Sequence, residues 1–452
     1  MGTLFSKLKG AWNLYQQIDM EQLSKLSAKV DLPTVLRNVG KMDEQQLAGM
    51  MKLLSADPKE KKQPPVDGDF YQLSETLSEE DRSLQLKVRS FMETEIKPII
   101  NEHWLAGTFP YDMIPRLATM NACGITYKGY GCAGRSFLME GILAMEMARV
   151  DTSISTFFGV QSGLAMGSIY LLGSKSQKQE WLPALREFRK IGAFGLTEPE
   201  VGSAAAGGLT TTVKKVGEEW IINGQKKWIG NATFADVIII WARDEADQKV
   251  KGFLVKKDAP GLTVEKIEDK MALRVVQNGL ITLKNCKVTE ADRLPLANSF
   301  KDTAMVLRMT RAGVAWQAVG CARGAYENAL KYTLNRKQFG RPIASFQLIQ
   351  NHLVEMLSNL TAMQAMVFRL STLQDEGKLT DAHASLAKVF CSAHTRDVVA
   401  RAREVMGGNG ILMEYDVARF VADAEAIYSY EGTKEINTLI VGRAITGLSA
   451  FV

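Results

Sequence analysis

The hydrophobic period changes twice along the chain, and this change constrains the fold more than any other sequence feature. From Ser78, whose side chain suits a helix N-cap, to about Lys190, apolar residues recur at helical spacing. Between about Phe194 and Val288 short β-rich runs replace that period, and after Asn298 the helical period returns. This order predicts an α+β chain with an N-terminal helical domain, a middle β-domain and a C-terminal helical bundle.

The middle segment predicts an antiparallel sheet. Its apolar runs lie at residues 220–222, 237–241, 252–255 and 280–283. No helix-length segment separates them, which argues against the parallel sheet of a Rossmann fold. The Asn223-Gly224 pair is typical of a tight hairpin turn, so we expect the chain to reverse there.

The C-terminal segment predicts an antiparallel four-helix bundle. Candidate helices cover residues 303–335, 346–375, 380–406 and 433–448, and such lengths suit a bundle. The breaks between them carry glycine or proline, which commonly end helices. Because 452 residues exceed one hydrophobic core, we predict four parts, at residues 1–66, 67–193, 194–300 and 301–452.

Residues 1–66 predict an appendage. Two amphipathic helical patterns, at residues 4–18 and 35–54, precede a polar linker at 57–65 that is rich in Lys and Pro. The pattern fits an extra helical pair packed on the body of the protein. The other interpretation is a segment that docks on a membrane surface or a partner.

Composition excludes several classes of function. The 55 Lys and Arg and the 50 Asp and Glu are scattered with no long block of one sign, which argues against a nucleic-acid partner. The five cysteines lack C-x-x-C spacing and the four histidines are far apart, so we expect neither a disulfide framework nor a metal site. No apolar stretch of about 18 residues and no signal-peptide pattern occur, which predicts a cytoplasmic protein.

Five short segments are more informative by their order than one by one. A glycine-rich loop after a helix is usually a cap, and an arginine in a helix is usually solvated, so each segment alone is a weak signal. The segments are Thr197-Glu198-Pro199 with Gly202-Ser203, Lys227-Trp228-Ile229-Gly230-Asn231, Arg336-Lys337-Gln338-Phe339-Gly340, Met406-Gly407-Gly408-Asn409-Gly410 and Tyr430-Glu431-Gly432-Thr433.

The joint order of these segments resembles the acyl-CoA dehydrogenase family over roughly residues 68–452. The likeness is strongest to the glutaryl-CoA dehydrogenases and the plant short-chain acyl-CoA oxidases. It is carried by Ile222-Asn223-Gly224-Gln225-Lys226, Tyr430-Glu431-Gly432-Thr433 and Gly442-Arg443-Ala444-Ile445-Thr446-Gly447. The resemblance implies a helical domain, a β-domain and a C-terminal bundle that clasps FAD. The implied activity is FAD-dependent α,β-dehydrogenation of an acyl-CoA thioester to the trans-2-enoyl-CoA.

The resemblance implies that Glu431 is the catalytic base. A thioester α-proton is poorly acidic in water, so its removal needs a positioned carboxylate, and the β-hydrogen then leaves as hydride to the flavin. The main-chain N–H of Glu431 would polarise the thioester carbonyl, and Gly432 would let the substrate approach. From its position alone, Glu431 is better explained as an acidic residue ahead of a helix that starts near Thr433, where the helix dipole favours negative charge.

Further cofactor and substrate contacts follow from the same resemblance. It implies flavin contacts for Phe194, Leu196, Thr197, Ser203, Trp228, Ile229, Gly230 and Thr433, and contacts to FAD across a subunit interface for Arg336, Phe339, Gln347, Gly407 and Gly408. It implies substrate contacts for Ser155, Thr156, Ser203, Arg311 and Gly432. An arginine suits the anionic CoA, although Arg311 taken alone is a solvated helix residue. The expected partners are an acyl-CoA, further copies of this chain in a homotetramer, and an electron-transfer flavoprotein as acceptor.

Three positions depart from the family pattern. Gly230 stands where many dehydrogenases have a Thr that bonds the flavin, and the plant oxidases share this glycine, so O₂ is an alternative acceptor. Ala204 replaces an Asp that usually follows Gly-Ser. Ser155 stands where glutaryl-CoA dehydrogenases hold the distal carboxylate with an arginine. Because a buried carboxylate without a cation is costly, we expect an uncharged short or medium acyl chain. Glutaryl-CoA, with Arg135 as substitute cation, is the alternative substrate, and an inactive acyl-CoA-binding relative is the non-enzyme alternative.

Overall fold

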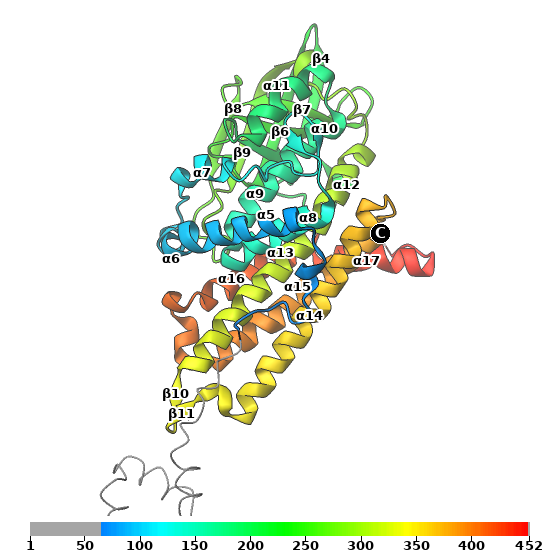
Figure 1. The fold of residues 1–452 in the computed structure, drawn as a ribbon. Helices are drawn as coiled ribbons and strands as arrows, with labels where there is room; N and C mark the ends of the chain where they lie inside the picture. The colour runs from blue at the N-terminus through cyan, green and yellow to red at the C-terminus, as the bar shows by residue number, and fades with distance from the viewer. Residues whose placement is uncertain (1–64, 451–452) are drawn as a thin grey trace, which may run out of the picture. The chain divides into compact units, whose positions relative to one another are not determined.

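The computed structural model describes residues 65–450 of the chain (Figure 1). The helices predicted at residues 4–18 and 35–54 lie outside this range. Within it, α-helices precede and follow a β-sheet, which confirms the predicted order of helical, β and helical parts. None of the helices in this range is long and apolar enough to cross a membrane.

The first helical part surrounds a continuous apolar core. Ser78 caps its first long helix as predicted, since its hydroxyl accepts from the Asp81 amide at 3.2 Å. Val88, Met92 and Ile96 follow at four-residue spacing and are fully buried. The helices are α5 (Glu79–Phe91), α6 (Lys97–Ala106), α7 (Ile114–Ala118), α8 (Phe137–Val150), α9 (Thr152–Gly159), α10 (Met166–Leu172) and α11 (Lys175–Arg186).

The main sheet has seven strands and is mixed. Its strands are β3 (Gly192–Gly195), β4 (Thr212–Val216), β5 (Glu219–Ile229), β6 (Val237–Asp244), β7 (Val250–Lys256), β8 (Leu262–Lys266) and β9 (Gly279–Thr289). The expectation of a purely antiparallel sheet is wrong at two pairings, because β3 and β4 each run parallel to β6. Between β3 and β4 the chain passes through the short helix α12 (Ala205–Gly208), and the whole β4–β5 hairpin then serves as the crossover to β6.

The Asn223-Gly224 pair does not form the predicted hairpin. It lies inside β5, where the pairing with β9 shifts by one residue between Ile222 and Gly224, so the pair makes a β-bulge. Gly224 has a φ of +143°, and a Cβ there would lie 2.6 Å from Cα of Thr211. The bulge therefore requires glycine, and the reversal of the chain occurs earlier, between β4 and β5, at Gly217 with a φ of +59°.

The C-terminal part is helical as predicted but holds one helix more than the four expected. The predicted helices correspond to α13 (Phe300–Asn335), α14 (Gln347–Asp375), α15 (Asp381–Val405) and α17 (Lys434–Thr446). The fifth helix, α16 (Val417–Ser429), was not predicted, although Val417, Phe420, Ala424 and Ile427 place a buried apolar stripe at helical spacing. Long α13 packs against α15 and α8 and so connects the two helical parts (Figure 1).

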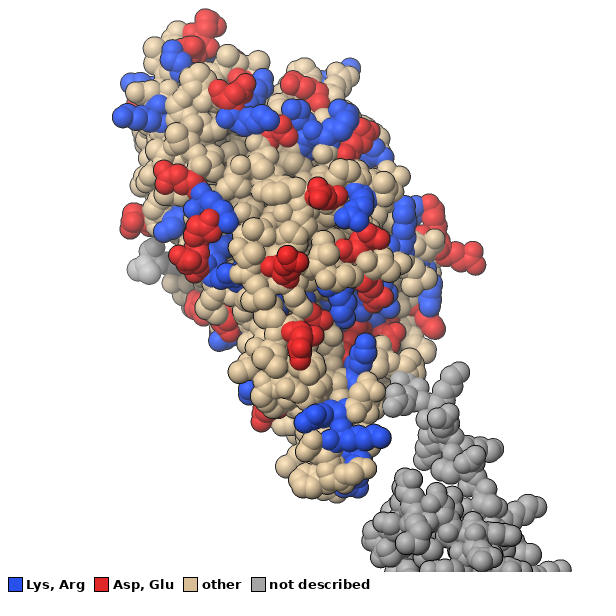
Figure 2. All heavy atoms as spheres, turned by 90° about the vertical axis from the view of Figure 1, so that its left-hand side faces the viewer, with Lys and Arg blue, Asp and Glu red and all other residues tan. Residues whose placement is uncertain are grey.

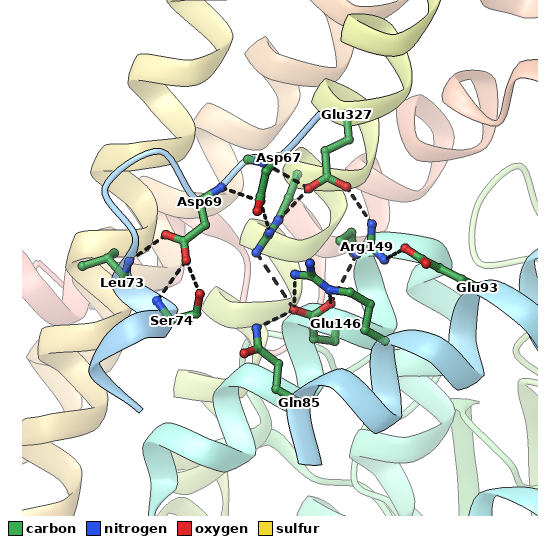
Figure 3. A network of polar contacts seen from close by, with 12 residues as sticks. Asp67, Asp69, Leu73, Ser74, Gln85, Glu93, Glu146, Arg149 and Glu327 are labelled. Carbon is green, nitrogen blue, oxygen red and sulfur yellow. Dashed lines mark hydrogen bonds and ion pairs between the residues drawn. The ribbon is translucent and has the colours of Figure 1, made fainter. Parts of the chain in front are cut away.

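A buried network of charges ties the start of the described chain to α5, α8 and α13 (Figure 3). Arg323 of α13, 1% exposed, donates to Glu327 at 2.8 Å and pairs with Asp67. Arg149 of α8 donates to Glu327 at 2.7 Å and lies 3.3 Å from Glu146, which is fully buried. Because every charge in this network has a partner, the cost of burying it is offset.

Charges of both signs are interspersed on the face shown in Figure 2. Ion pairs of this kind occur at the surface of the protein; for example, Lys190 and Lys257 lie 3.1 and 3.2 Å from Asp236. Such a surface offers no broad patch of a single sign on that face.

Candidate active site

The candidate base lies on a short turn between two helices. Glu431 has a φ of +57° and Gly432 a φ of +83°, and Thr433 caps α17 by accepting from the Ile436 amide at 3.3 Å. A left-handed conformation is unusual for a residue with a side chain and persists only where its surroundings fix it. The Glu431 carboxyl accepts from the Thr310 hydroxyl of α13 at 2.8 Å.

The surroundings of Glu431 set its charge state. The side chain is half-buried, and this burial raises the pKa of its carboxyl. The positive charges of Arg311 and Lys388 and the Thr310 hydrogen bond act in the opposite direction but do not outweigh burial. Nε of Arg311 is buried and has no hydrogen-bond partner among the described residues, so this guanidinium has a donor left to offer.

Residues beside this turn use their polar groups within the protein. Tyr430 donates from its hydroxyl to Oε1 of Gln317 at 2.6 Å, and burial raises the pKa of this phenol. Ser155 is 1% exposed and donates to the Ala144 carbonyl at 3.0 Å. Thr156 donates to the Thr152 carbonyl at 2.8 Å. The hydroxyls of the two predicted substrate residues of α9 are therefore bonded within the protein, and neither residue brings a charge to the site.

A buried ion pair joins two of the sequence segments in the sheet. Nζ of Lys226 lies 2.8 Å from Oε1 of Glu198 and also donates to the Leu196 carbonyl at 3.1 Å. The Lys227 amide donates to the Thr197 carbonyl at 2.8 Å. Phe194 and Leu196 are buried beside these contacts. The Thr197 and Trp228 segments, which are about thirty residues apart in sequence, are thus held side by side.

Trp228 forms an exposed aromatic surface next to this joint. Its side chain is 53% exposed and its backbone is left-handed, with a φ of +66°. Its carbonyl accepts from Asn278 at 3.1 Å, Ile229 beyond it is buried, and Gly230 is half-buried. A flat, largely apolar ring that is open to solvent suits a planar ring system. Ser203, on the loop that follows Thr197, is exposed and offers a hydroxyl. These residues therefore fit a flavin.

A second set of predicted cofactor residues lies at the other end of the molecule. Arg336 directly precedes the hairpin of β10 (Lys337–Gln338) and β11 (Arg341–Pro342), and Phe339 lies in its turn. Figure 1 places this hairpin at the end of the molecule opposite the main sheet. Phe339 is 92% exposed, and Gln347, Gly407 and Gly408 are exposed too. The glycine turn is near Arg336, because Asn409 donates to the Tyr332 hydroxyl at 2.8 Å. Within one chain, the structure does not bring this set to Glu431.

Four residues of the site went unassigned in the sequence. Thr310 precedes the predicted Arg311, and Glu198 and Lys226 stand inside segments singled out for other members. Lys388 had one usable signal, since it shares the apolar face of Ala384, Ala387 and Cys391 at helical spacing. A lysine in an apolar stripe is rarely buried without a partner and can mark such a site.

Comparisons with known proteins agree along most of the chain. Models of the acyl-CoA dehydrogenase N-terminal, middle and C-terminal domains match residues 78–189, 193–286 and 300–446. A glutaryl-CoA dehydrogenase structure from Mycobacterium smegmatis aligns with a TM-score of 0.82 and 37% identity over 84% of this chain and 98% of that one. Another structure of such an enzyme from that organism, 34% identical, contains FADH2.

Two further proteins are similar over nearly their whole length. The butyryl-CoA dehydrogenase structure of Megasphaera elsdenii aligns with a TM-score of 0.79 and 30% identity, over 82% of this chain and 98% of that one. The caffeyl-CoA reductase-Etf complex subunit CarC of Acetobacterium woodii is 32% identical over 81% of this chain and 98% of that one. The chain therefore belongs to the acyl-CoA dehydrogenase family and is an FAD-dependent oxidoreductase.

Proposed function

We propose that the protein oxidises an acyl-CoA thioester to the trans-2-enoyl-CoA, with Glu431 as the base that removes the α-proton. One observation carries the proposal. The Glu431 carboxyl is partly withdrawn from water and accepts from Thr310 of α13, which is a different helix from the one that follows it. An acidic residue that served only the dipole of α17 would place its carboxyl at that helix terminus.

The residues of this chain can prepare the reaction in three ways. Glu431 takes the α-proton, and its raised pKa brings the base closer to the pKa of a weak carbon acid. The left-handed backbone of Glu431 and Gly432 presents main-chain N–H groups that can polarise the thioester carbonyl. Arg311, with its unpartnered Nε, supplies positive charge for the anionic CoA. FAD, when bound against Trp228, Thr197, Ser203 and Gly230, supplies the acceptor for the β-hydrogen as hydride.

The substrate we favour carries an uncharged short or medium acyl chain. Ser155, in place of an arginine, is buried and uses its hydroxyl within the protein, so it offers no cation to a distal carboxylate. Arg135, the alternative cation, is already paired with Asp81 at 2.7 Å. Glutaryl-CoA remains the second candidate because a glutaryl-CoA dehydrogenase is 37% identical.

The acceptor, the assembly and the location belong to the same proposal. Similarity to a subunit of an Etf complex supports an electron-transfer flavoprotein as acceptor, whereas Gly230 favours O₂. The resemblance implies contacts to the FAD of another subunit from Arg336, Phe339, Gln347, Gly407 and Gly408. Such contacts require an oligomer, and the resemblance supports a homotetramer. The five cysteines are free in the structure, in keeping with a reducing compartment, and we place the protein in the cytoplasm.

The test is an anaerobic titration of the purified protein with butyryl-CoA, octanoyl-CoA and glutaryl-CoA while the flavin spectrum is recorded. We expect butyryl-CoA or octanoyl-CoA to bleach the wild type, and Glu431→Gln to stay oxidised. Glu425→Gln is the matched control, since Glu425 lies on α16 in an exposed pair with Arg396. Equal bleaching by glutaryl-CoA would overturn the substrate preference. A yellow protein that no thioester bleaches would favour the inactive acyl-CoA-binding relative.

A further inference from the structure

Lys388 is a lysine in the core of the C-terminal bundle. It lies in the middle of α15 and its side chain is fully buried, at 0% exposure. Ala384, Ala387 and Cys391 on the same face are buried with it. Burying an ammonium group in apolar surroundings is costly unless each of its protons finds an acceptor. The position of Lys388 therefore calls for a reason.

Both hydrogen bonds of the Lys388 ammonium go to the turn that carries Glu431. Nζ donates to the Tyr428 carbonyl at 2.8 Å and to the Gly432 carbonyl at 2.7 Å. The first carbonyl belongs to the last turn of α16, where carbonyls lack helical partners and attract cations. The second follows Glu431 directly. One side chain thus connects the two ends of the turn, on either side of the base.

The turn depends on such support. Two successive residues, Glu431 and Gly432, are left-handed, and a non-glycine residue such as Glu431 keeps this conformation only where the surrounding structure fixes it. Nδ2 of Asn437 supplies the other bond to the Gly432 carbonyl, at 2.8 Å. Of these two bonds to the Gly432 carbonyl, the one from Lys388 comes from a different helix, so it links the turn to α15.

We propose that Lys388 is a positioning residue for proton abstraction, whose ammonium group holds the turn of Glu431 and favours the ionised form of that carboxyl. The inference rests on the proposed function, because it requires Glu431 to be the base. The hydrogen bonds of Lys388 go to backbone carbonyls and not to the Glu431 carboxyl, so it acts through the backbone and by charge.

The charges around the turn support this assignment. Arg311 from α13 and Lys388 from α15 both act on Glu431, and Glu435 of α17 acts on Lys388. Burial and the charge of Arg311 lower the pKa of Lys388, Glu431 and Glu435 raise it, and the resulting pKa is about 8. A lysine with this pKa is mostly protonated at neutral pH, so its positive charge is present when Glu431 must be ionised.

A half-buried lysine whose ammonium group is also bonded to carbonyls provides a control for loss of such bonds. Nζ of Lys270 donates to the carbonyls of Leu273 and Val276 and to Oδ1 of Asn278, at 2.8, 2.6 and 2.6 Å. Burial lowers its pKa to about 8 as well. It supports a loop between β8 and β9 and does not act on Glu431.

The experiment uses the full-length protein with its flavin and compares Lys388→Met, Lys388→Gln, Lys388→Arg and Lys270→Met. Stopped-flow reduction of the flavin by butyryl-CoA is followed from acid to alkaline pH, together with the melting temperature. We expect the flavin of Lys388→Met to be reduced about tenfold to a hundredfold more slowly at neutral pH. The acid limb, which is the part of the pH–rate profile where the rate falls with falling pH, should move to higher pH. Lys388→Gln, which keeps a donor but no charge, should show the same movement of the limb, and Lys388→Arg should restore it.

Lys270→Met should lower the melting temperature and leave the acid limb in place. A wild-type limb in Lys388→Gln, or equal rate losses in Lys270→Met and Lys388→Met, would overturn the inference while the proposed function stands. If Lys388→Met does not fold, Lys388→Gln and Lys388→Arg still decide the question by their limbs. A wild type that butyryl-CoA, octanoyl-CoA and glutaryl-CoA all fail to bleach would overturn the proposed function and the inference together.

Discussion

The hydroxyl of Thr310 donates to Oε1 of Glu431 at 2.8 Å, from α13 to the turn before α17. A hydrogen bond to a charged group contributes about 1.5–3 kcal/mol. We therefore expect Thr310→Val, which keeps the shape, to slow flavin reduction by butyryl-CoA at neutral pH by about tenfold, because the ionised carboxyl loses a donor. The measurement is the stopped-flow rate.

A control for this substitution lies on the same helix. Thr303 is fully buried, and its hydroxyl has no hydrogen-bond partner among the described residues. Thr303→Val removes a hydroxyl that bonds nothing there, so the rate should equal that of the wild type. Equal rates for Thr310→Val and Thr303→Val would show that the Thr310 bond is unimportant for the base.

The rate of flavin reduction should depend on pH in a direction set by Glu431. Burial raises the pKa of this carboxyl, and the base acts only when ionised. The rate should therefore be lost as pH falls, and the loss should begin at less acidic pH than the ordinary glutamate pKa of about 4.3. A rate that stays level down to that value would contradict the assignment.

The buried pair of Glu198 and Lys226 should be essential for stability. The side chains are 1% and 0% exposed and 2.8 Å apart. Glu198→Gln would leave the lysine buried without its counterion, and breaking such a pair costs about 3–5 kcal/mol. Urea unfolding checks this, with Glu219→Gln as control. Its pair with Lys287, at 3.0 Å, is about half-exposed and should contribute no more than about 1 kcal/mol.

The contribution of the Glu198–Lys226 pair to the free energy of unfolding should decrease at acid pH. Burial acts to raise the pKa of Glu198, but Lys226 and the bonds from Thr210 outweigh it, and the pKa is about 2. A lowered carboxyl pKa stabilises the fold above the unfolded value of about 4.3 and loses that contribution as pH falls toward about 2. Glu198→Gln should therefore show a flatter decline of unfolding free energy over this acid range than the wild type.

The bulge in β5 should tolerate no side chain at Gly224. An alanine Cβ would lie 2.6 Å from Cα of Thr211, at a φ of +143° that L-residues rarely adopt. We expect Gly224→Ala to lower the unfolding free energy by about 1–3 kcal/mol. Gly207→Ala is the matched control, since a Cβ there meets nothing within 4 Å. Similar melting temperatures for the two variants would contradict the role of the bulge.

Local sequence signals predicted the elements whose causes are local. Ser78 caps α5 because its own side chain supplies the acceptor, and the runs at 237–241 and 252–255 became the paired strands β6 and β7. The hairpin predicted at Asn223-Gly224 was wrong because a β-bulge and a hairpin turn both favour a glycine with positive φ. The parallel pairing of β3 with β6 joins residues such as Gly192 and Val237, 45 positions apart in sequence, and no period within either strand encodes its partner.

The candidate site divides in the same way. Glu431 and Trp228 stand in recognisable segments, so the resemblance could assign them. Lys388 and Thr310 belong to the site because helices far apart in sequence meet there. The contact that makes Lys388 relevant joins it to the carbonyl of Gly432, 44 residues later, and only the packing of α15 against the turn brings the two together.

The charge network of Figure 3 determines where the chain can be shortened. The N-terminal family match begins at residue 78, yet the Gly68 amide donates to Glu327 at 3.1 Å and Asp67 pairs with the buried Arg323. A chain that starts at residue 78 would lack Asp67 and Gly68. Glu327 would then lose a hydrogen-bond donor, and the buried guanidinium of Arg323 would lose one of its carboxylate partners. A shortened protein that keeps its interior charges matched begins no later than Val66.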